Sequence, residues 1–134
     1  PASLVTRGTE TILYAEDETS VRTVATSVLE RQGYRVLEAA NGESALAISR
    51  AFPGRIDLLL TDVVMPGMSG RDLAEAMQRL RPGIRVMFAS GYADDEALLG
   101  NVRKNAQMFL QKPFAALELA RRVRGALDLA AHTE

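Results

Sequence analysis

Short apolar runs that end in polar residues recur along the chain and predict buried strands. The clearest run is Ile56-Asp57-Leu58-Leu59-Leu60-Thr61-Asp62, which ends in a carboxylate and is followed by Met65-Pro66-Gly67. Three further runs end in a similar way: residues 12–15 before Glu16 and Asp17, residues 86–89 before Ser90 and Gly91, and residues 108–110, one position before Lys112 and Pro113. Runs of this length are typical of strands covered on both faces in a parallel sheet. The segment 34–39 predicts the remaining strand.

The segments between the predicted strands have the residue spacing of helices. Four segments carry apolar or small residues three and four positions apart, as core-facing helices do. They are Val21, Val24, Ala25, Val28 and Leu29; Ala45, Ile48, Ser49 and Phe52; Leu73, Ala76, Met77 and Leu80; and Ala116, Leu119, Ala120, Val123 and Leu127. The segment 93–106 has only a thin stripe, Leu98 and Val102, and predicts a short helix. In the last helix we expect Arg121, Arg122 and Arg124 to point mostly outward.

Polar caps, glycine and proline mark where the helices should start and stop. The expected limits are Thr19 or Ser20 and Gly33 for the first helix, Asn41-Gly42 and Pro53-Gly54 for the second, and Ser69 and Pro82-Gly83 for the third.

Five strands alternating with five helices predict a doubly wound α/β fold, with right-handed crossovers and helices on both faces of a parallel sheet. In the strand order 2-1-3-4-5 the first and third strands lie side by side. Their carboxyl ends then bring Glu16, Asp17 and Asp62 together, at the edge where such sheets bind ligands.

Length and composition indicate one globular domain. The chain has 134 residues, of which 47% are hydrophobic, and a net charge of -1, so nothing draws it to nucleic acid or to a membrane. It has no cysteine, which excludes disulfides and thiolate metal sites and favours a cytoplasmic location; a parent protein attached to a membrane is compatible with this. We expect a polar linker over 1–10, the domain over 11–129 and a frayed tail over 130–134.

The residues at the predicted strand ends suggest phosphoryl chemistry. Three crowded carboxylates repel one another unless a cation joins them, and oxygen ligands suit Mg²⁺ or Mn²⁺. The Asp62 carboxylate could then attack phosphorus, with Lys112 and the Ser90 hydroxyl holding the phosphoryl oxygens. Only Lys104 and Lys112 among the 16 basic residues are lysines, so Lys112 is not incidental. Taken singly, each of these residues could instead be an ordinary turn residue.

Four motifs resemble the receiver domain of two-component response regulators over residues 11–129. They are Ile12 to Glu18, Leu58 to Gly70, Phe88 to Tyr92 and Phe109 to Phe114. The resemblance implies that Asp62 is the phosphoacceptor and that Glu16, Asp17, Asp62 and the Val64 carbonyl bind Mg²⁺. It also implies roles for Ser90 and Lys112 at the phosphate and a cis Lys112–Pro113 peptide bond. Phe109 would be the aromatic switch residue, although a purely structural role in the core is an equal alternative.

Two positions near the site bear on the lifetime of the phosphate. Fast-hydrolysing relatives often carry an amide or acid two residues after the phosphoacceptor, whereas this chain has Val64 there and Tyr92 two residues after Ser90. We therefore expect slow self-dephosphorylation.

The phosphoryl group has to come from a partner. The chain has no ATP-binding glycine motif and thus no kinase core, and its single histidine, His132, lies in the tail. A histidine kinase or a histidine phosphotransfer protein is the expected donor, docking near Arg22. Readout, including a possible homodimer, would use the face formed by residues 93–127.

Several contexts fit the resemblance. The lead-in from Arg7 to Leu13 favours the C-terminal receiver of a hybrid sensor histidine kinase, and the alternative is a stand-alone response regulator. An aspartyl-phosphate phosphatase would also use a strand-end Asp, Mg²⁺ and a Lys, but Val64 occupies the place of its usual second Asp. A purely structural receiver-like module is the third possibility, but such modules usually lack the phosphoacceptor or the acidic pair, and this chain has both. Whether the domain counts as an enzyme stays open, since it would only assist its own phosphorylation and dephosphorylation.

Overall fold

The computed structural model describes residues 6–91 and 108–129. Its elements in chain order are β1 (Thr11–Ala15), α1 (Thr19–Arg31), β2 (Arg35–Ala39), α2 (Gly42–Ala51), β3 (Leu58–Asp62), α3 (Gly70–Leu80), β4 (Arg85–Ser90), β5 (Phe109–Gln111) and α5 (Ala116–Asp128). The described residues therefore hold four of the five predicted helices. The helix expected over 93–106, the tail 130–134 and Tyr92 lie outside them.

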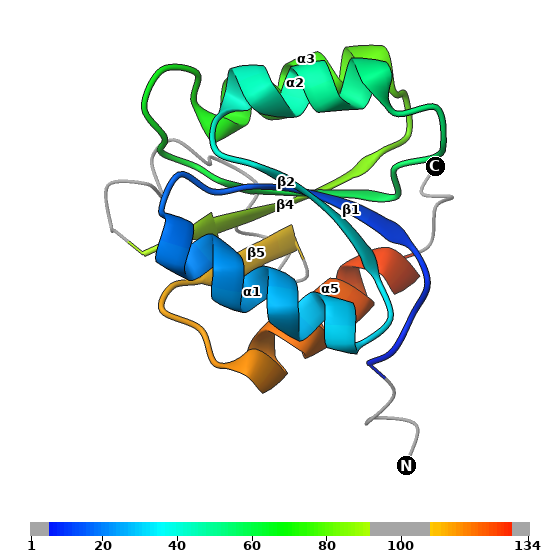
Figure 1. Cartoon of the computed structure of the whole chain (residues 1–134), viewed down its shortest axis with the longest axis vertical. Helices are drawn as coiled ribbons and strands as arrows, with labels where there is room; N and C mark the ends of the chain where they lie inside the picture. The colour runs from blue at the N-terminus through cyan, green and yellow to red at the C-terminus, as the bar shows by residue number, and fades with distance from the viewer. Residues whose placement is uncertain (1–5, 92–107, 130–134) are drawn as a thin grey trace.

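The five strands form one parallel sheet in the order β2-β1-β3-β4-β5, which confirms the predicted topology. Figure 1 shows α2 and α3 on one face of the sheet and α1 and α5 on the other. The central pair, β1 and β3, is in register from Ile12 opposite Leu58 to Ala15 opposite Thr61. Glu16, which directly follows β1, and Asp62, the last residue of β3, are thus neighbours.

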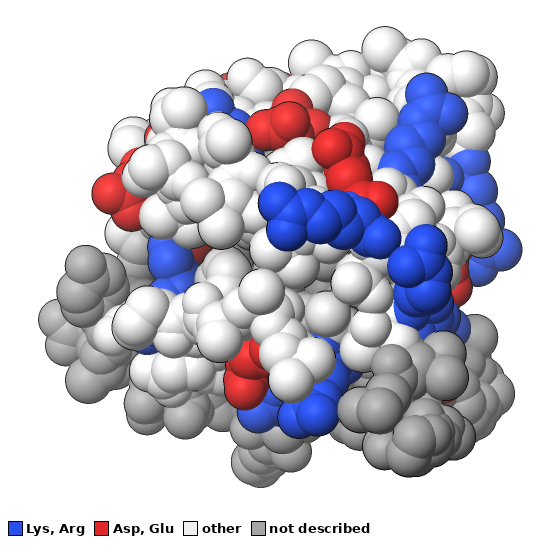
Figure 2. Space-filling model, turned by 60° about the horizontal axis from the view of Figure 1, so that its bottom comes forward, with Lys and Arg blue, Asp and Glu red and all other residues white. Residues whose placement is uncertain are grey.

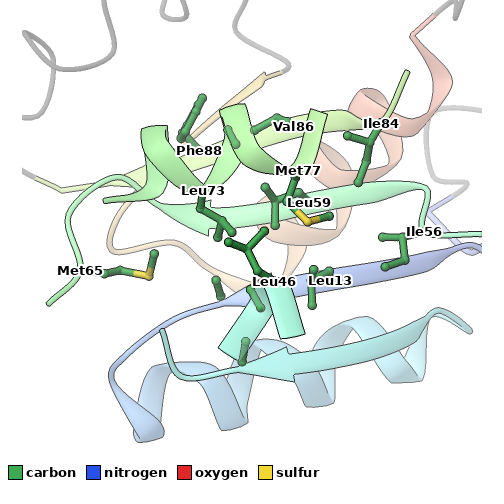
Figure 3. Packing of buried hydrophobic residues seen from close by; sticks show 14 of the residues in the cluster. Leu13, Leu46, Ile56, Leu59, Met65, Leu73, Met77, Ile84, Val86 and Phe88 are labelled. Carbon is green, nitrogen blue, oxygen red and sulfur yellow. The ribbon is translucent and has the colours of Figure 1, made fainter. Parts of the chain in front are cut away.

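Alternating side chains of the central strands build a separate core on each face of the sheet. On the α2 and α3 side, Leu13 and Leu59 pack with Leu73 and Met77, as Figure 3 shows. On the opposite side the cluster includes residues from β1, β3, α1 and α5, namely Ile12, Leu58, Leu60, Ala25, Leu29, Leu119 and Val123. None of the helices in the described ranges combines the length and apolar character that crossing a bilayer demands.

Two predicted caps are confirmed and one is wrong. The Asn41 side chain accepts a hydrogen bond from the Ser44 amide at 2.7 Å, and the Ser69 hydroxyl accepts one from the Asp72 amide at 3.1 Å. Helix α1, however, already includes Thr19 and Ser20, and its cap residue Glu18 makes no side-chain capping bond. The Glu18 amide donates instead to the Glu16 carboxylate at 3.0 Å, so a side chain of the acidic cluster stabilises the turn before α1.

Some apolar residues that helical spacing places on the core-facing side of a helix are exposed in the structure. Val24 is 64% exposed and Leu80 42% exposed, and Ala116 is exposed as well, so all three were wrongly predicted to face the core. Ala116 and Leu80 are terminal residues of α5 and α3, whereas Val24 lies beside Ala25, through which α1 packs. The prediction that Arg124 points outward is also wrong, because only 15% of its side chain is exposed.

Strand β2 starts one residue later than predicted. The Tyr34 amide donates to the carbonyl of Leu29 in the preceding helix, at 3.3 Å, and Tyr34 is buried. Pairing with β1 therefore begins at Arg35, opposite Thr11.

Candidate functional site

Three carboxylates meet at the carboxyl ends of β1 and β3. Oxygen atoms of Glu16, Asp17 and Asp62 lie within 4.8 Å of one another. Glu16 and Asp62 are 1% and 5% exposed, whereas Asp17 is exposed. The Glu16 amide extends the sheet ladder by donating to the Ala39 carbonyl at 3.0 Å, which holds the residue at the strand end. The predicted acidic cluster is thus present, with two of its members shielded from water.

Lys112 connects the two buried carboxylates. Its Nζ lies 3.1 Å from Glu16 Oε1 and 3.0 Å from Asp62 Oδ1. The Lys112 amide donates to the Ser90 carbonyl at 2.9 Å, which aligns the residue beside the end of β4. The Lys112–Pro113 peptide bond is cis, the isomer that the resemblance implies. The ammonium group is therefore placed where an anion on Asp62 would arrive.

The site holds more negative charge than Lys112 neutralises. Burial raises the pKa of Asp62 to about 8, together with a hydrogen bond to Glu16 and the Glu16 charge, and Lys112 only partly opposes this. Burial alone would lower the pKa of Lys112, but the charges of Asp62 and Glu16 outweigh it, so the pKa is raised. The site consequently retains a proton or attracts a further cation.

Ser90 and Phe109 occupy neighbouring strands beside the acidic cluster. Ser90 is the last residue of β4 and is 3% exposed. Phe109 is the first residue of β5, opposite Phe88 in the register, and is half-buried against the core on the α2 and α3 side. Ser90 thus lines the groove at the acidic cluster, Phe109 packs against the core beside β4, and Tyr92 lies beyond the described part of the chain.

A groove leads from the carboxylates between α1 and the loop after β5. Besides the acidic cluster, Ser90 and Lys112, its walls include Val21, Val24, Val64, Pro113 and Phe114. Figure 2 shows the α1 and α5 side of the molecule, where acidic and basic side chains lie next to each other among uncharged surface. The groove therefore combines a charged floor with an apolar wall.

Sequence reasoning missed two contributions to this site. Arg22, considered only as a landmark for docking, donates to the Glu16 carbonyl and lies 3.5 Å from Glu38. It therefore supports the turn that carries the acidic pair. Val24 was assigned to the core, and its place in the groove has no sequence signal, because helical spacing does not tell which edge of a stripe faces solvent.

Comparisons with known proteins agree on one family. The family model described as response regulator receiver domain matches residues 12–124. The chain is 40% identical over 122 residues to the sensor kinase CckA of Brucella abortus, covering 90% of this chain and 13% of that protein. It is 34% identical over 112 residues to the response regulator receiver protein CpdR of the same organism, covering 84% of this chain and 92% of CpdR. The chain thus spans nearly all of CpdR but only a small part of CckA.

Solved structures give the same result. The receiver domain of hybrid histidine kinase CckA is 43% identical, with a TM-score of 0.73 over 87% of this chain and 98% of that one. A response regulator receiver domain protein from Clostridium thermocellum is 27% identical, with a TM-score of 0.77 over 88% and 94% of the two chains. Since the family match, the relatives and the sheet topology agree, the chain belongs to the response regulator receiver domain family.

Proposed function

We propose that this domain accepts a phosphoryl group onto Asp62 from a histidine of a partner protein and changes conformation in response. The observation that carries the proposal is the position of Lys112 Nζ, 3.0 Å from Asp62 and 3.1 Å from Glu16 at the ligand-binding edge of the sheet. A buried aspartate beside a cation and further carboxylates is suited to nucleophilic attack on phosphorus.

The transfer exchanges one bond to phosphorus for another. A carboxylate oxygen of Asp62 forms the new bond as the bond from phosphorus to the donor imidazole breaks, and the imidazole keeps the electron pair and takes up a proton. The Lys112 ammonium, which donates hydrogen bonds to both Asp62 carboxylate oxygens in this structure, would hold a phosphoryl oxygen as a point charge after the transfer. The Ser90 hydroxyl would donate to another oxygen, which draws β4 toward the site.

Glu16, Asp17 and Asp62 fit a bound Mg²⁺ or Mn²⁺. Their oxygen atoms are close enough to share one ion, and a cation there would offset the burial and the Glu16 charge that raise the pKa of Asp62. The Val64 carbonyl is the proposed fourth protein ligand. When bound, the ion would offset the negative charge of the incoming phosphoryl group.

The groove is the proposed docking surface for the phosphodonor. Val21, Val24, Pro113 and Phe114 form an apolar wall next to the acidic floor, and Val24 is 64% exposed. A helix of a histidine kinase or phosphotransfer protein would cover these side chains and direct its histidine at Asp62. This position refines the expected docking near Arg22, whose guanidinium is engaged with Glu16 and Glu38.

Val64 supports a slow loss of the phosphoryl group. Its side chain lines the groove and is 55% exposed, so an apolar group stands where an amide or acid would orient water. We expect Val64→Asn to hydrolyse the phosphoryl group faster than the wild type. An unchanged rate in the variant would remove the support for this role, and Tyr92 would then be the next position to vary.

The favoured context is the receiver of a hybrid sensor histidine kinase in the cytoplasm. The identity of 40% with the sensor kinase CckA supports this, while the 92% coverage of CpdR supports the stand-alone alternative. A homodimer through the 93–127 face remains a proposal, because much of that face lies outside the described residues. A phosphatase is disfavoured by the apolar Val64, and a structural module by the presence of Asp62 and its acidic neighbours.

Intact-mass spectrometry after incubation with acetyl phosphate and Mg²⁺ tests the proposed function. The wild type should gain one phosphoryl group, and both Asp62→Asn and a chelator should prevent the gain. Equal gain in Asp62→Asn would refute Asp62 as the acceptor. No gain in the wild type, even with a phosphorylated histidine donor, would refute the function.

A further inference from the structure

Residues 6–10, which lead into β1, lie against the ends of α1 and α5. The Gly8 amide donates to the Gln32 carbonyl at 3.0 Å, and the Thr6 hydroxyl donates to the Gln32 side chain at 2.6 Å. The buried Tyr34 hydroxyl donates to the Thr6 carbonyl at 3.2 Å. Figure 1 shows this first described part of the chain, in dark blue, beside the end of α1 and near α5. The described residues 6–10 are therefore docked on the domain.

Arg124 of α5 is the centre of this attachment. Its guanidinium donates to the Arg7 carbonyl at 3.1 Å, to the Tyr34 hydroxyl at 3.1 Å and to Glu10 at 2.8 Å. It also pairs with Asp128 of its own helix at 2.8 Å. The hydrogen bond from Arg124 lowers the pKa of Glu10. One side chain of α5 thus binds two of residues 6–10 and also Tyr34, which itself donates to Thr6.

Two glycines show how tightly the segment is seated. A Cβ atom at Gly8 would overlap the side chains of Arg124, Glu10 and Tyr34. Gly33 has a φ of 107°, and a Cβ there would overlap the Gly8 carbonyl. Glycine at both positions therefore permits the close approach between the backbone at Gly8 and the backbone at Gly33.

Helix α5 links this contact to the phosphoacceptor site. The helix begins shortly after Pro113, and Lys112 holds Asp62 and Glu16. Its buried residues Leu119 and Val123 pack into one cluster with β1 and β3, which ties the helix to the two strands that end at the site. If a phosphoryl group took over the bonds of Lys112, a displacement of that residue would reach Arg124 through α5.

We propose that residues 6–10 form a strap whose docking on α1 and α5 changes when the phosphoacceptor site is modified. Arg124 is the positioning residue that joins the strap to α5. The proposal rests on the proposed function, because it requires that Asp62 become modified. Signalling would then leave the domain at its amino-terminal entry as well as at its surface.

Nuclear magnetic resonance on the ¹⁵N-labelled full chain tests the strap. Beryllium fluoride with Mg²⁺ serves as the mimic of a phosphoryl group on Asp62. The probes are the amides of Val63, which donates to Ala89 beside the site, and of Gly8 in the strap. In the wild type both resonances should shift when the mimic is added.

Variants of the joint separate the strap from the site. In Arg124→Gln we expect hydrogen exchange of the Gly8 amide to be faster by about tenfold or more. The Gly8 resonance should not shift when the mimic is added, whereas the Val63 resonance should still shift. Glu10→Gln should act in the same direction, and it carries the test if Arg124→Gln does not fold. Arg121→Gln, at an exposed position of the same helix, should behave as the wild type.

The outcomes distinguish the strap from the function beneath it. A wild-type shift at Val63 without one at Gly8 would overturn the strap and leave the proposed function standing. An equal response of Gly8 in the wild type and in both joint variants would overturn the role of Arg124. If neither amide responds in the wild type, the proposed function fails, and the strap fails with it.

Discussion

The metal-free domain should lose stability as the pH rises from 5 to 8, because the folded site keeps a proton that the unfolded chain releases. Burial and Glu16 raise the pKa of Asp62 from 3.8 to about 8. Between these values the folded state binds more protons than the unfolded state, so the free energy of unfolding falls with pH. Below pH 4 the carboxyl is protonated in both states, and the penalty disappears.

The size of the effect follows from the pKa difference. One bound proton corresponds to a slope of about 1.4 kcal/mol per pH unit, and the whole shift to a penalty on the order of 5 kcal/mol above pH 8. Asp62→Asn removes the titrating group while Lys112 keeps Glu16 as a partner. The variant should therefore lack this slope and be more stable than the wild type at pH 8. Mg²⁺ competes with the proton and should stabilise the wild type more at pH 8 than at pH 6.

Urea unfolding followed by circular dichroism, with a chelator present, provides the measurement, since the chain has no tryptophan to serve as a fluorescent probe. Comparing the wild type with Asp62→Asn at each pH cancels the groups that titrate in both proteins. A wild-type stability that is constant or rises from pH 5 to pH 8, or the same slope in Asp62→Asn, would show that Asp62 does not keep a proton in the folded state over this pH range.

Three further predictions concern stability away from the site, all measured by urea unfolding at pH 7. Thr26→Val should stabilise by about 1 kcal/mol, because the buried Thr26 hydroxyl has no hydrogen-bond partner among the described residues, whereas Thr23→Val at an exposed position of the same helix should change little. A Thr26→Val protein less stable than Thr23→Val would contradict this. Arg81→Ala should lower the free energy of unfolding by about 2 to 3 kcal/mol, because the Arg81 guanidinium donates to three carbonyls and a hydroxyl at the end of α2. Arg79→Ala, at an exposed position, is the control, and equal effects of the two substitutions would argue against a stabilising role of these hydrogen bonds. Asn41→Ala should cost about 1 kcal/mol through loss of the α2 cap, and an unchanged stability would show that the cap contributes nothing.

The sheet and the acidic cluster were predictable because both depend on local patterns. Buried strands of a parallel sheet read as short apolar runs, and the polar residue after each run is automatically at the ligand-binding edge. Once β1 and β3 are neighbours, Glu16 and Asp62 come together without further information. The position of Lys112 follows from the same rule applied to β5.

Features that depend on long-range packing were not predictable. Helical spacing identified the stripe of α1 but not that Val24 would lie in a groove with Pro113 and Phe114. Arg124 contacts Glu10, 114 positions away, and Tyr34, 90 positions away, and no local signal connects the three residues. The polar composition of residues 1–10 predicts a linker and gives no sign that the described residues 6–10 dock on α1 and α5.

Chemical trapping of the phosphorylated protein tests whether Asp62 carries the phosphoryl group. The phosphorylated wild type is reduced with borohydride, which converts an aspartyl phosphate into homoserine, and the site is located by peptide mass spectrometry. We expect homoserine at position 62 and nowhere else, with Mg²⁺ required for its appearance. Homoserine at position 17 or at any other carboxylate, with Asp62 unmodified, would show that Asp62 is not the phosphoacceptor.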